Sequence, residues 1–219
     1  MVEPFTILLA LLPLIGYLVV FSMIRLSGHA LVTTGGRDIA ALAFAVSGMV
    51  IAGPIELFFP RAAATVFGAK VWIALAIFYM LCVLLIALTS HPKLVVYGRT
   101  PSETFGPLLA AAQAIDPNAH GNSDNLQVVM PTSGVRLRAD GQRLTDFTEI
   151  LSFEPNLAPQ FWNQLMAGLR RELGPTQVAR PRQGFTMLLV AGALSGLMIW
   201  QSFSNQELVV QGFREWLWR

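Results

Sequence analysis

The ionisable side chains that could do chemistry in this chain are of two kinds, and the first is a lone carboxylate. Glu56 follows Gly53 and Pro54 inside an otherwise uncharged run. A carboxylate in an apolar helix is costly unless it is paired, protonated or hydrated, so it can mark a proton or ion pathway. It can also reach the interface or pair with Arg61 or Lys70. We favour this structural role and keep the pathway as an alternative, with a helix bend expected at the Gly-Pro pair.

The second kind is a group of four carboxylates that lie close together in the sequence. They are Asp140, Asp146, Glu149 and Glu154. Two carboxylates that converge on one cavity can act as general acid and general base. These four are predicted to fall on turns and strand ends, where a solvated rim is the commoner arrangement. A membrane enzyme that uses them is therefore a lesser alternative.

Other signatures of catalysis or cofactor binding are missing from the sequence. It contains no G-x-S-x-G, Walker A, H-E-x-x-H, Cys pair or G-x-G-x-x-G motif. The histidines His29, His91 and His120 lack the spacing of metal or haem ligands. Cys82, the single cysteine, has no disulfide partner in the chain. We expect no cofactor, no metal and no catalytic residue, and we favour a non-enzymatic role.

Four long apolar runs decide the class of the protein. They span residues 5–24, 39–59, 71–88 and 185–203. Each is close to the roughly 20 residues that a helix needs to cross the hydrocarbon of a bilayer. Of the 219 residues, 54% are hydrophobic and 13% are charged, whereas charge runs near 25% in soluble domains. The sequence predicts an α-helical integral membrane protein with four transmembrane helices, three of them within residues 1–90 and the fourth within 185–205.

The polar stretch 91–184 is predicted to form a small α+β soluble domain inserted between helices 3 and 4. The expected order is β-α-β-β-β-α, with strands at 94–97, 126–130, 135–138 and 147–153 and helices at 101–115 and 159–173. Such an order suits an antiparallel sheet with two helices on one face. The tail 206–219 carries apolar residues at helical spacing and is predicted to be an amphipathic interfacial helix, with a partner-binding face as the alternative.

The basic residues near helix ends predict the orientation. Those on the side of the soluble domain are Arg25, Arg37, Lys93, Arg99, Arg180 and Arg182. Those on the opposite side are Arg61, Lys70, Arg214 and Arg219. Because cytoplasmic loops carry the excess of Lys and Arg, we expect a cytoplasmic domain with both termini outside, in the cell (inner) membrane. Arg170, Arg171, Arg180 and Arg182 are expected to approach anionic lipid. The net charge of +2 gives no nucleic-acid signal.

Small residues in two of the predicted spans indicate close helix packing. Gly48 lies among alanines and Ser47 in the second run, and Gly192 and Gly196 have GxxxG spacing in the fourth. We favour packing within the chain and keep a homodimer face as the alternative.

Three functions remain open. The favoured hypothesis is a membrane-anchored interaction or scaffolding protein whose cytoplasmic domain binds a protein partner or a second copy. The others are a small transport or membrane-complex subunit that uses the Glu56 region, and the carboxylate enzyme.

Overall fold

The computed structural model describes residues 4–51, 70–141, 146–154, 157–176, 178 and 181–218. The chain forms two compact units. The helical unit comprises Met1–Ser22, Ile39–Leu88 and Phe185–Arg219, and the sheet unit comprises Met23–Asp38 and Thr89–Gly184. The sheet unit therefore draws on two separate parts of the chain.

The sheet unit contains a six-stranded sheet in which each neighbouring pair is antiparallel. Its strands are β1 (Leu31–Thr34), β2 (Lys93–Tyr97), β3 (His120–Asn122), β4 (Gln127–Met130), β5 (Val135–Asp140) and β6 (Phe147–Ser152), in the order β1-β2-β6-β5-β4-β3. Strand β5 alternates buried and exposed residues along its whole length, because successive side chains of a strand point to opposite faces. One face of this sheet therefore forms part of a hydrophobic core.

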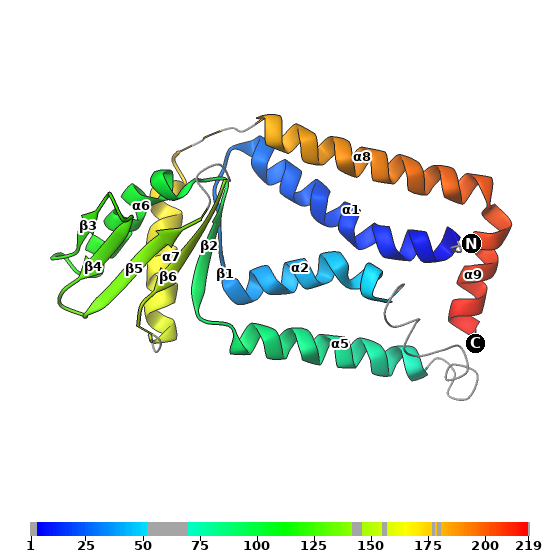
Figure 1. Cartoon of the computed structure of the whole chain (residues 1–219), viewed down its shortest axis with the longest axis horizontal. Coiled ribbons are helices and arrows are strands. Elements are labelled where there is room, and N and C mark those ends of the chain that lie inside the picture. The colour runs from blue at the N-terminus through cyan, green and yellow to red at the C-terminus, as the bar shows by residue number, and fades with distance from the viewer. Residues whose placement is uncertain are drawn as a thin grey trace. The chain divides into compact units, whose positions relative to one another are not determined.

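Two helices, α6 (Pro101–Gln113) and α7 (Pro159–Leu173), cover that face (Figure 1). Thr100 caps α6 in a capping box with Glu103, and both helices carry proline at a first-turn position, where no backbone donor is lost. Leu165, Leu169 and Leu173 form one buried stripe of α7. They pack with α6 and with inward residues of all strands but β3 into one core. This burial is the main stabilising term of the sheet unit.

The predicted order β-α-β-β-β-α was incomplete, because it lacked two strands. Residues 31–34, expected to be part of a plain connection between two spans, form the edge strand β1 and pair with β2. Residues 120–122, expected to be loop, form the short edge strand β3. Both depend on a partner strand for their hydrogen bonds, so local sequence gives little sign of them.

The helical unit contains the apolar helices. They are α1 (Pro4–Ser27), α2 (Gly35–Val50), α5 (Lys70–Thr89), α8 (Pro181–Ser204) and α9 (Gln206–Trp218). Of these, α1, α2, α8 and the last residue of α5 extend into the sheet unit. Within the described residues, two helices rather than four are long and apolar enough to cross a bilayer, Pro4–Ser27 and Gln183–Ser204. Ile73–Thr89 is a shorter apolar helix, and the second predicted span is described only as far as Ile51.

The backbone of α1 lies very close to α2 at Gly48. A Cβ atom at this position would lie 2.1 Å from the carbonyl oxygen of Leu9 and 2.8 Å from that of Ala10. Only a residue without a side chain fits against a neighbouring backbone at this distance. By contrast, a Cβ at Gly192 or Gly196 would meet nothing within 4 Å among the described residues, so the use of these two glycines stays a prediction.

Candidate functional site

The face of the sheet opposite α6 and α7 carries exposed side chains on β5 and just after β6, beside half-buried side chains of β4 and β6. We call this surface the open face and define it by Val129, Arg136, Arg138, Leu151 and Phe153. The strand register makes it continuous, since Val129 pairs with Arg136 and Arg138 pairs with Leu151. Arg138 is exposed, and Phe153 keeps 50% of its surface accessible. A half-exposed phenylalanine beside arginines is typical of a binding surface.

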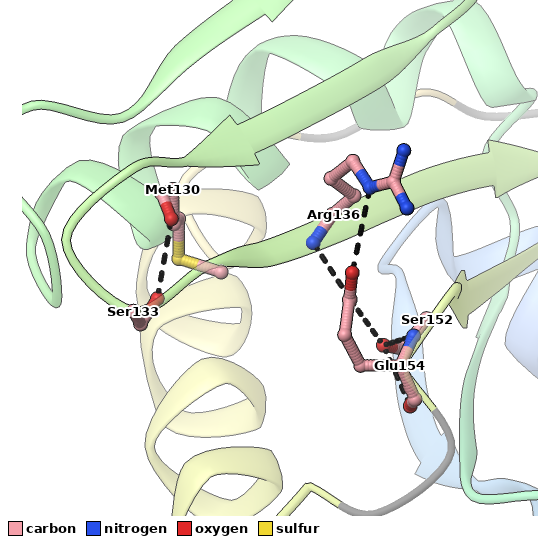
Figure 2. A network of polar contacts seen from close by, with 5 residues as sticks. All are labelled: Met130, Ser133, Arg136, Ser152 and Glu154. Atoms are coloured by element: carbon pink, nitrogen blue, oxygen red, sulfur yellow. Dashed lines mark hydrogen bonds and ion pairs between the residues drawn. The ribbon is translucent and has the colours of Figure 1, made fainter.

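A polar network holds the centre of the open face in place (Figure 2). The carboxylate of Glu154 accepts a hydrogen bond from the backbone N–H of Arg136 at 2.8 Å and pairs with its Nε at 3.4 Å. The hydroxyl of Ser152 donates to Glu154 at 3.2 Å. The guanidinium of Arg136 lies 5.4 Å from the centre of the Phe153 ring, within cation–π range. Arg136 and Phe153 are thus preorganised.

The electrostatics of Glu154 follow from this network. Burial by itself would raise the pKa of its carboxyl, but hydrogen bonds from the backbone of Arg136, from Ser152 and from the Arg136 side chain outweigh it. The pKa of Glu154 therefore lies below its ordinary value, and the Arg136 pair stays charged at neutral pH.

The four candidate carboxylates have separate partners. Glu154 binds Arg136 as above, and Glu149 pairs with Lys93 at 2.8 Å. Asp140 lies opposite Glu149 in the sheet but accepts the N–H of Gly141. Among the described residues, no three His, Cys, Asp or Glu side chains lie close enough together to hold a metal ion. Glu149 and Glu154 are thus each bound to a different basic residue, and the carboxylate enzyme stays a prediction.

The predicted solvent exposure of Asp146 was wrong. The residue was expected on a solvated rim, yet its side chain is only 1% exposed and forms an ion pair with Arg25 at 2.8 Å. The amide of Gln183, with its nitrogen turned toward Asp146, donates to both carboxylate oxygens at 3.1 and 3.2 Å. The backbone carbonyl of Asp146 accepts the N–H of Gly98 at 2.8 Å. We call Arg25, Gly98, Asp146 and Gln183 the Asp146 junction.

A second buried group holds the same part of the sheet unit together. Arg99 is 2% exposed and donates to the carbonyl oxygens of Gly98 at 2.8 Å and Gly28 at 3.3 Å. It also donates to the carbonyl oxygen of Thr176. The segment after α1 and the segment before α8 are therefore both bound to one guanidinium. The sequence offered Arg99 only as an orientation charge, because its partners lie far from it along the chain.

The basic residues expected near lipid have different surroundings. Arg170 donates from Nη2 to the carbonyl oxygen of Val32 at 2.9 Å, where it covers part of the edge strand β1. Arg171 is exposed. Arg180 and the side chain of Arg182 lie outside the described residues, as do Gly53, Pro54 and Glu56. The lipid contact and the Glu56 pathway therefore stay predictions.

A buried carboxylate at the end of α6 gives the fold a pH dependence. Asp116 accepts the backbone N–H groups of Asn118 at 3.0 Å and Thr132 at 2.9 Å, and the hydroxyl of Thr132 at 2.9 Å. Burial would raise the pKa of Asp116, but hydrogen bonds from Thr132, Asn118 and Ser133 outweigh it and hold the pKa below its ordinary value. This contribution to stability is full above the unfolded pKa of about 4 and is lost as the pH falls through the folded pKa.

We therefore expect Thr132→Val to raise the pKa of Asp116 toward its unfolded value. The variant should have a lower urea midpoint at pH 7 than the native chain and should lose less of its stability below about pH 4. Urea unfolding of the full chain in mild detergent at a series of pH values measures both effects. Ser123→Ala, on an exposed turn, is the control. Parallel pH profiles for Thr132→Val and the native chain would contradict the assignment.

Comparison of the chain with protein-family models, with curated proteins and with solved structures finds no match in any of the three.

Proposed function

We propose that this chain is a membrane-anchored interaction protein whose sheet unit binds a protein partner on the open face. The observation that carries the proposal is the Arg136–Phe153 pair, which is held in place by Glu154 and yet remains accessible. The side chain of Arg136 is 61% exposed even with its ion pair formed. Ordered aromatic and arginine side chains lose little conformational entropy on binding, which is why they dominate binding energy in many interfaces.

The anchoring part of the proposal rests on the surface of the apolar helices. In the most apolar stretch of α1, only 11% of the residues are buried, and the same holds for α8. The core helix of a soluble protein would be mostly buried. Large apolar side chains such as Met23, Leu189 and Trp200 are more than 60% exposed, and lipid is the solvent in which such a surface is stable. We propose four spans in the cell membrane, with the sheet unit in the cytoplasm and both termini outside.

The charges of the open face support a protein partner over a nucleic acid. Arg136 and Arg138 are flanked by Asp140, Glu149 and Glu154, so the surface alternates in sign. Nucleic-acid sites use a continuous basic patch. A surface that mixes charged and apolar side chains fits a protein surface of complementary charge pattern.

Site-specific photo-crosslinking in native membranes tests the proposal. A benzophenone amino acid replaces Arg138 on the open face, and in a control it replaces Gln164, which is exposed on α7. We expect a discrete protein adduct from position 138 only. Adding Phe153→Ser should lower its yield about tenfold, as loss of one interface anchor does. Equal adducts from both positions, or adducts with lipid alone, would contradict binding at the open face.

A further inference from the structure

The helical unit contains a large cavity between α2 and α5, which run side by side (Figure 1). Its volume is about 600 Å³. It is an open groove, since its lining residues Phe44, Ile73 and Met80 are 61–66% exposed, and its volume falls in the range of ligand pockets, roughly 300–1,000 Å³. The cavity is therefore of the size of a binding site.

The small side chains on its walls explain why the cavity is open. Ala40, Ala43 and Ser47 line it from α2 at helical spacing, and Ala76 lines it from α5. The hydroxyl of Tyr79 on α5 donates to the carbonyl oxygen of Ala43 on α2 at 2.6 Å. This hydrogen bond links the two helices along the wall of the cavity.

The state of the polar groups on the wall decides what chemistry can occupy it. Ser47 and Tyr79 are the two hydroxyl-bearing residues among the described lining residues. Ser47 donates to the carbonyl oxygen of Phe44 at 2.8 Å, and Tyr79 donates to that of Ala43. Their donors are thus used, and the remaining lining side chains are apolar. Water needs two to four polar partners in such a space, so an apolar occupant without hydrogen-bonding groups is favoured.

We propose that this cavity binds one acyl chain of a membrane phospholipid, an inference that rests on the membrane placement in the proposed function but not on the protein partner. The outward side chains around the cavity are apolar and exposed, among them Ile77 at 56% and Phe78 at 65%. In a bilayer these side chains contact lipid tails, so acyl chains are the apolar molecules present at the cavity. Because lipid tails are as apolar as these side chains, an acyl chain that enters from the bilayer gains packing contacts with the alanine walls rather than hydrophobic burial.

Retention of lipid by the purified full-length chain tests the inference. The chain is reconstituted with phosphatidylcholine, washed in mild detergent and weighed by native mass spectrometry. We expect one retained phosphatidylcholine per chain. Ala76→Phe, whose ring occupies part of the cavity, should lower the retained fraction about tenfold, because the loss of roughly ten carbon–carbon dispersion contacts is enough for this change. Ala43→Leu provides a second filled cavity in case Ala76→Phe does not fold.

Ala74→Phe and Ala41→Phe are the matched controls, since both alanines are exposed on the same helices and neither lines the cavity. Both controls should retain lipid like the native chain. Equal retention by the filled and control variants, or no retained lipid in the native chain, would overturn the inference. Resistance to alkaline carbonate extraction checks membrane insertion separately. A chain that stays in the membrane without retaining lipid therefore contradicts the acyl-chain site and leaves the proposed function standing.

Discussion

Asp146→Ala is expected to destabilise the sheet unit by about 3–5 kcal/mol, the cost of removing one partner of a buried ion pair. The change leaves the Arg25 guanidinium, whose side chain is 17% exposed, without the carboxylate that it binds at 2.8 Å. It also removes the acceptor of the Gln183 amide. Hydrogen exchange of β2 and β6 peptides during urea unfolding of the full chain in mild detergent measures the loss.

Two variants separate the ion pair from a general effect of removing charge. Asp140→Asn removes an exposed carboxylate on the neighbouring strand and should change stability by less than about 0.5 kcal/mol. The double variant Arg25→Met, Asp146→Leu should recover most of the loss, because it leaves no buried charge unpaired. If Asp146→Ala and Asp140→Asn unfolded at the same urea concentration, the Asp146 junction would have no special role.

Gly48→Ala should destabilise the helical unit by about 3 kcal/mol, the upper end of the usual cost of overpacking. The added methyl group would lie 2.1 Å from the carbonyl oxygen of Leu9, and backbone cannot turn aside as a flexible side chain can. Alanine is the better helix former by about 1 kcal/mol, so a loss of stability isolates the steric term. Thermal unfolding followed by circular dichroism in detergent measures the change.

Gly192→Ala is the matched control on α8. Nothing lies within 4 Å of a Cβ at that position among the described residues, so helix propensity alone should act and the melting temperature should stay level or rise. We therefore expect a lower melting temperature for Gly48→Ala but not for Gly192→Ala. A melting temperature that is unchanged in Gly48→Ala would contradict the close crossing of α1 and α2. A fall in Gly192→Ala would indicate that a second copy packs at the GxxxG face.

The interactions tested at Asp146 also bear on the proposed function. The Asp146 junction and Arg99 join the last turn of α1, the segment before α8 and the sheet within one unit. Strands β5 and β6, which carry the open face, belong to that same sheet. A binding surface on regular strands is preorganised when buried contacts hold the sheet in place. Less conformational entropy is then lost when a partner binds. Asp146→Ala should therefore weaken the position-138 crosslink as well, without touching the surface itself.

The sequence alone determined the features that depend on local periodicity. The apolar runs gave α1, α5 and α8 nearly their observed bounds, and the stripe ending at Leu173 gave α7 its observed bounds, 159–173. Alternation of apolar and basic residues gave β5, and the run ending at Met130 gave β4. These elements follow from which side chains must leave water, a property that is written in the spacing of residues a few positions apart.

Only the tertiary structure decided the rest. The strand β1 forms because residues 31–34 pair with β2, more than fifty positions away. Asp146 is buried because Arg25 and Gln183, which are far apart in the sequence, both bind its carboxylate. The sequence predicted two helices on one face of the sheet, but it did not predict that Phe153 would be exposed on the other. Pairing across such distances depends on the closure of long loops and on shape complementarity, and neither is a property of neighbouring residues.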